Sequence, residues 1–209
     1  MNSRFTEDDF GVTHLASLFH QDWRAGGSGG ELVAGYVNEM PIPYIHALAE
    51  DASALAASGA AGPLATLWEC ATGSNHRLDA DAALAWFQNI ASISGSRLIG
   101  VDQAKIESMH ESSYDELRAR VVLEIDQIGS GLNEAIEKNS WVKLPGVVAS
   151  LRFCATDVSP DLAFRFLLRA IMEYSCSIQR IQYERFIELG RDFAYGEFVV
   201  SRVEYLVDD

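Results

Sequence analysis

The sequence has few basic residues. Lys and Arg number 16 among 209 residues, against 30 Asp and Glu, which gives a formal net charge of -14. Residues 1–100 carry 4 basic and 11 acidic side chains and residues 101–209 carry 12 and 19, so each part has a charge of -7. Such a charge repels nucleic acids and anionic membrane surfaces and favours basic partners. It also keeps many proteins in solution, so charge alone identifies no partner.

Cysteine is scarce, and long apolar runs are missing. Cys70, Cys154 and Cys176 lie far apart with no Cys-x-x-Cys pair, which is typical of reduced thiols in the cytosol. No run approaches the roughly 18 apolar residues of a membrane span. The first nine residues carry acids where a secretory signal would have its apolar segment. We therefore expect a cytoplasmic protein that enters no membrane and binds no nucleic acid.

The motifs of common catalytic, cofactor and metal sites are also missing. The sequence has no Gly-x-Ser-x-Gly elbow, and the glycines of residues 26–30 lack the Gly-Lys-Ser/Thr ending of a phosphate loop. Glu31 would repel phosphate there. His20 and Asp22 are two residues apart, so they cannot share one helical face, and they fall short of a zinc ligand set. We expect no catalytic residue, cofactor or metal, and therefore no enzyme.

Apolar residues are abundant and follow a helical pattern. They form 48% of the chain, enough to bury a core at this length. Most segments repeat them every three or four residues, which predicts an all-α fold: a compact multi-helix domain with a helical C-terminal extension. The last segment, residues 193–207, suits a strand as well as a helix, and we expect a helix. A glycine boundary predicts two helical units, residues 1–97 and 98–209, packed against each other.

Caps and prolines predict where several helices begin. We expect a first helix from Thr6 to near Trp23, a second that Ser28 or Gly29 starts, and a third that Pro43 starts. Asp79 should cap a later helix, and Ser159-Pro160 should begin a long helix that reaches Gly190. The large side chains expected in the core include Phe19, Trp23, Leu84, Trp86 and Phe87.

The most distinctive stretch is Phe19-His20-Gln21-Asp22-Trp23, where an apolar helical face ends in polar and aromatic residues just before the glycines. One interpretation is structural: Trp23 packs under the next helix, while His20 and Asp22 form hydrogen bonds with the turn. The other is direct contact of these residues with a partner. We favour the structural interpretation.

This stretch resembles the Phe-His-Gln-Asp-Trp signature near the N-terminus of immunity proteins from bacterial contact-dependent growth inhibition systems. The resemblance covers residues 5–95 and includes Phe10, the Glu50-Asp51 pattern and Leu84-Ala85-Trp86-Phe87. Residues 100–209 are not part of the family pattern.

The resemblance implies a cytoplasmic antidote that binds and blocks a toxin delivered by neighbouring cells. We expect a basic, nuclease-type toxin domain whose active site is occluded by the acidic helical protein. The resemblance assigns no toxin-contacting residue and no oligomeric state. The alternative function is an acidic helical interaction or scaffold domain unrelated to toxins.

Overall fold

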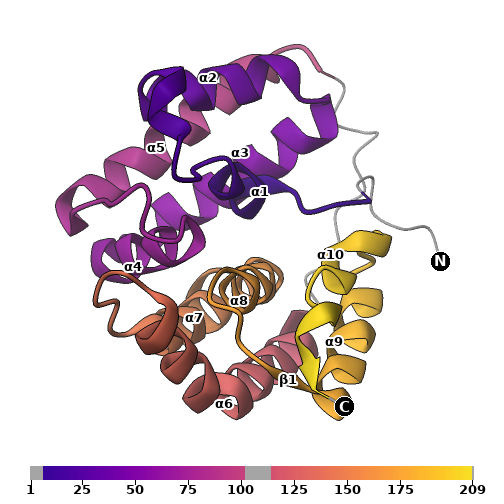
Figure 1. Ribbon diagram of the computed structural model, residues 1–209. Helices are drawn as coiled ribbons and strands as arrows, with labels where there is room; N and C mark the ends of the chain where they lie inside the picture. The colour runs from indigo at the N-terminus through magenta and orange to yellow at the C-terminus, as the bar shows by residue number, and fades with distance from the viewer. Residues whose placement is uncertain (1–6, 102–113, 209) are drawn as a thin grey trace. The chain divides into compact units, whose positions relative to one another are not determined.

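The computed structural model describes residues 7–101 and 114–208 (Figure 1). These residues are mostly helical, which confirms the all-α prediction, and their only strands are Ile178–Gln179 (β1) and Val207–Asp208 (β2). None of the described helices has the length and apolar character needed to span a membrane. The chain divides into an N-terminal unit, Phe10–Ser108, and a C-terminal unit, Met1–Asp9 with Met109–Asp209. The sequence had placed the division after residue 97.

The N-terminal unit is built around two long helices that pack along each other, α3 and α5. Helix α1 packs on α3, and α4 packs on α5. The elements of this unit are α1 (Gly11–Ser17), the 3-10 turn η1 (Trp23–Gly26), α2 (Gly29–Glu39), α3 (Ile42–Ala57), α4 (Ala61–Ala71) and α5 (Ala80–Arg97).

Three helices of this unit begin within one residue of the predicted starts. Ser28 caps α2: its side chain accepts a hydrogen bond from the Glu31 N–H at 3.2 Å, and the Glu31 carboxylate accepts one from the Ser28 N–H at 2.7 Å. This capping box satisfies two N–H groups that the helix leaves without internal partners. Pro43 lies in the first turn of α3, where its fixed backbone angle suits a helix start. Asp79 occupies the N-cap position of α5 as predicted, but its side chain makes no capping hydrogen bond.

The first helix is shorter than predicted. The sequence placed Glu7, Asp8 and Asp9 in its first turn, but α1 begins at Gly11 and ends at Ser17. Asp9 forms an ion pair with Arg202 at 2.7 Å instead, within the C-terminal unit. The first turn of α1 is capped from α3, because the buried Asp51 carboxylate accepts a hydrogen bond from the Val12 N–H at 2.9 Å. Asp51, which is distant in sequence, therefore caps the first turn of α1, a role that the sequence had suggested for the acidic residues just before it. The predicted start at Thr6 lies outside the described residues.

The other elements of the C-terminal unit pack around its central helix, α8 (Pro160–Glu173). All residues of α8 from Pro160 to Ile171 are buried. Ser159 caps it by accepting the Leu162 N–H, and Pro160 is in its first turn, as predicted. The other elements of this unit are α6 (Tyr114–Asn139), α7 (Val147–Phe153), the π-helical turn η4 (Cys154–Val158), α9 (Arg180–Asp192), α10 (Glu197–Ser201) and the 3-10 turn η5 (Glu204–Leu206).

Helix α8 carries a buried polar group in the middle of this apolar core. The Asp161 carboxylate pairs with Arg165 one turn away at 3.1 Å and accepts a hydrogen bond from the Tyr195 hydroxyl at 2.7 Å. A buried charge needs such partners, because an isolated one would cost several kcal/mol of solvation. The network therefore ties the segment after α9 to the start of α8.

The predicted long helix from Ser159 to Gly190 is wrong, because it is two helices. Helix α8 ends at Glu173, and Ser175 has a φ of 50°, a left-handed conformation that closes a helix. The Cys176 N–H then returns to the Ile171 carbonyl at 2.9 Å, and Asn139 donates to the Tyr174 carbonyl. After this break β1 pairs in parallel with β2. The last segment, residues 193–207, is mainly helical, because it contains α10 and η5. Only its end belongs to the short sheet, through β2.

Candidate functional site

The two ends of the Phe-His-Gln-Asp-Trp stretch lie in a group of packed rings, which we call the aromatic cluster. The ring of His76 is near its centre, with centroids 4.6 Å from Phe19, 5.0 Å from Trp23 and 4.8 Å from Trp86. Most ring pairs within the whole cluster meet edge to face, an arrangement that aromatic side chains prefer, although His76 is tilted against Phe19 and Trp86. The aromatic cluster consists of Phe19, Trp23, Trp68, His76, Trp86 and Phe87.

Two indole hydrogen bonds connect the aromatic cluster to the segment between α4 and α5. Trp23 Nε1 donates to the Asn75 carbonyl at 2.9 Å, and Trp68 Nε1 donates to His76 Nδ1 at 2.8 Å. The turn after α1 is therefore held against α4 and the α4–α5 connection. Sequence reasoning missed His76, because a single histidine in a polar connection carries no signal of its own.

His76 is uncharged at neutral pH. Its Nδ1 accepts the Trp68 hydrogen bond, so the neutral ring must carry its proton on Nε2. Burial, and to a smaller extent the nearby positive charge of Arg24, lower the pKa of His76 to about 4. The imidazole therefore acts as a core aromatic and a hydrogen-bond acceptor.

Acid should weaken the fold through His76. Its pKa is about 4 in the folded chain and near 6.5 when unfolded, so the unfolded chain binds more protons between these values. This contribution to stability is complete above pH 6.5 and is lost as the pH falls toward 4. We expect a loss of about 1 to 2 kcal/mol between pH 7 and 4.5, below the full linkage value because the ring is only partly buried.

The measurement is denaturant unfolding of the wild type and of His76→Gln at the two pH values. Glutamine keeps an acceptor for Trp68 but does not titrate, so the variant should lose less stability on acidification than the wild type. Equal losses in the two proteins would contradict this role of His76.

Gly29, the first residue of α2, lies directly against the aromatic cluster. A Cβ atom there would come within 3.1 Å of His76 Nε2 and 3.1 Å of the Trp86 ring. We expect Gly29→Ala to lower the free energy of unfolding by about 1 kcal/mol, since packed rings give way only at a cost. Gly30→Ala is the matched control, because its Cβ would meet nothing within 4 Å. It should be neutral or slightly stabilising in thermal unfolding. Equal melting temperatures for the two variants would contradict this prediction, because they would show that the rings can move aside without loss of stability.

The middle of the stretch faces outward. His20, Gln21 and Asp22 are exposed, and the Asp22 N–H donates to His20 Nδ1 at 3.2 Å. The Arg24 guanidinium lies 4.7 Å from the centre of the Trp23 ring. The stretch thus has buried aromatic ends and an accessible polar centre.

The expected core residues are not all buried. Phe19, Trp23 and Phe87 are buried, whereas Leu84 and Trp86 are only partly buried. Leu84 and Trp86 were therefore placed too deep by helical periodicity, which gives the side of a helix but not how far neighbouring elements cover it.

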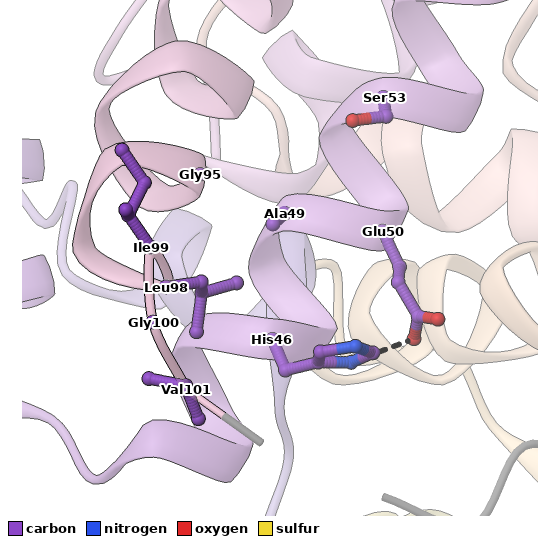
Figure 2. A pocket seen from close by; sticks show the side chains of 9 residues that line it. All are labelled: His46, Ala49, Glu50, Ser53, Gly95, Leu98, Ile99, Gly100 and Val101. Carbon is purple, nitrogen blue, oxygen red and sulfur yellow. Dashed lines mark ion pairs between the residues drawn. The ribbon is translucent and has the colours of Figure 1, made fainter. Parts of the chain in front are cut away.

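A second feature of the N-terminal unit is a groove of about 590 Å³ between α3 and the end of α5 (Figure 2). His46 Nδ1 lies 3.2 Å from the Glu50 carboxylate on its wall. Ser53 also lines the groove, but it follows His46 by seven residues, roughly 10 Å along the helix. That separation does not suit a nucleophile and its base, which need hydrogen-bond contact.

Residues 7–101 and 114–208 contain no candidate metal site and no activated cysteine. No group of three or more His, Cys, Asp or Glu side chains there could hold a metal ion. The three cysteines are buried thiols. Burial raises the pKa of Cys176 to about 11, which keeps it a protonated, weakly reactive thiol.

Comparison of the chain with models of protein families, with curated proteins and with solved structures finds no match.

Proposed function

We propose that this chain is an immunity protein that binds a cognate protein toxin and blocks its active site. The observation that carries the proposal is the Phe19–Trp23 stretch, whose order of residues resembles the immunity-protein signature. Its aromatic ends serve the fold, and its polar centre remains available to a partner. The protein acts by binding and by excluding substrate from the toxin, without chemistry of its own, in the cytoplasm of the cell it protects.

The distribution of charge supports a basic toxin domain of the nuclease type. An ion pair between an arginine and an acidic side chain has no net charge. The residues outside such pairs therefore carry the whole net charge of -14, and acidic side chains outnumber basic ones among them. A nuclease cleft is basic because it binds phosphates, and an acidic surface can occupy it by charge complementarity. Within the described residues the ion pairs of arginine include Arg77–Glu69, Arg118–Asp115, Arg120–Asp192, Arg152–Asp126, Arg165–Asp161, Arg169–Glu173, Arg185–Glu124 and Arg202–Asp9.

The test uses the toxin domain encoded by the gene next to the one for this protein. Both purified proteins are mixed, and complex formation is followed by size-exclusion chromatography together with the nuclease activity of the toxin. We expect a stable complex and loss of activity at equimolar protein. A toxin domain from an unrelated system is the control and should stay active. An interaction or scaffold domain unrelated to toxins would leave both toxins active.

A further inference from the structure

The groove between α3 and α5 has two chemically different walls. Apolar side chains of Leu98, Ile99 and Val101 form one wall, and the His46–Glu50 pair forms the other (Figure 2). Small residues complete the lining of the groove: Ala49, Ser53, Gly95 and Gly100. Small residues allow the backbone of another segment to come close.

The apolar wall is accessible from outside. The Ile99 side chain is 83% exposed, and Leu98 and Val101 are partly buried beside it. Together the exposed Ile99 and the two partly buried side chains form a continuous apolar surface beside a hollow, which is typical of binding sites, whereas isolated exposed apolar side chains are common on any surface. On the opposite wall the Glu50 side chain is 64% exposed, so its carboxylate is accessible to a cation of a partner.

We infer that this groove is where the toxin domain docks, through an amphipathic helix with apolar residues on one face and a Lys or Arg at its edge. The apolar face would cover Leu98 and Ile99, and the cation would meet Glu50. An amphipathic helix in a groove is a recurrent mode of recognition, with anchors three and four residues apart. The charge of Glu50 and of the chain as a whole selects a basic occupant. This inference rests on the proposed function and names the surface that serves it.

The test compares four substitutions in the full chain by calorimetric titration with the same toxin domain. Ile99→Glu places a charge on the apolar wall, and Glu50→Lys reverses the charge of the polar wall. We expect each to weaken binding at least tenfold. Ile181→Glu and Glu39→Lys are the matched controls, because both residues are exposed and neither lines the groove. They should change the dissociation constant less than threefold. Circular dichroism melting verifies that all four variants fold.

The outcomes separate the docking surface from the function. If the wild type binds the toxin and the groove variants bind equally well, the groove inference is wrong while the immunity function stands. If the wild type does not bind, the proposed function fails and the docking surface fails with it. If the groove variants change the oligomeric state of the protein alone, a second copy of this chain is the occupant, which also overturns the inference. If a Lys→Glu or Arg→Glu substitution in the toxin restores its binding to the Glu50→Lys variant, the substituted residue is the cation that pairs with Glu50.

Discussion

Replacement of Trp68 by alanine is expected to lower the free energy of unfolding by about 3 to 5 kcal/mol. The side chain is fully buried on α4, and its ring contacts Phe19, Trp86 and Phe87. Its removal leaves a cavity where several rings converge and deprives His76 Nδ1 of its hydrogen-bond donor. Because Phe19 and Trp23 pack in the same cluster, their turn should loosen first.

The measurement is urea unfolding followed by far-ultraviolet circular dichroism. Trp141→Ala is the matched control, since that tryptophan is 69% exposed and its loss creates no cavity. We expect it to cost less than about 1 kcal/mol. If the two variants lose similar stability, the aromatic cluster does not hold the N-terminal unit together.

Association with the toxin should slow strongly as salt is added. A net charge of -14 attracts a basic domain over distances up to the Debye length, which is about 10 Å at 0.1 M salt and becomes shorter as salt is added. We expect the association rate constant to fall at least tenfold between about 0.05 and 0.5 M sodium chloride, while the dissociation rate constant changes much less. Buried contacts hold the formed complex, and salt screens them weakly.

Stopped-flow mixing over a salt series measures both rate constants. Trp23→Ala is an informative second protein, because it should lower stability without changing the salt dependence of association. An association rate that is indifferent to salt would refute the electrostatic mechanism even if the toxin is bound and inhibited.

The parts of the fold that the sequence predicted are those that local chemistry determines. The start of α2 at Ser28 and Gly29, the proline in the first turn of α3 and the Ser159-Pro160 start of α8 each involve residues within one helical turn. Such signals act before any tertiary contact forms. Helical periodicity likewise identified the class of fold, because a buried stripe repeats every three or four residues.

The features that the sequence did not predict depend on distant contacts. Apolar spacing continues through residues 174–177, yet the left-handed Ser175 and the Asn139 hydrogen bond from α6 end the helix there. The acids before Gly11 looked like a helix start, but Asp9 pairs with Arg202. His76 joins the aromatic cluster only because α4 and α5 bring it beside Phe19. The sequence also predicts that Asp102 caps a short helix with Ile106 and Met109, but these residues lie outside the described part of the chain.

The groove was also beyond the sequence, for the same reason. His46 and Glu50 are one turn apart and could be paired from spacing alone. Their position opposite Leu98 and Ile99 follows only from the packing of α3 along α5.

Co-expression in a sensitive cell tests the central claim most directly. The toxin encoded beside this protein is induced in cells that carry either the wild-type protein or an empty vector. In a third set of cells the wild-type protein is present and an unrelated toxin is induced instead. The account predicts survival only with the wild-type protein and its own toxin, at levels where both proteins are soluble. Death of those cells, with both proteins soluble, would contradict the immunity function.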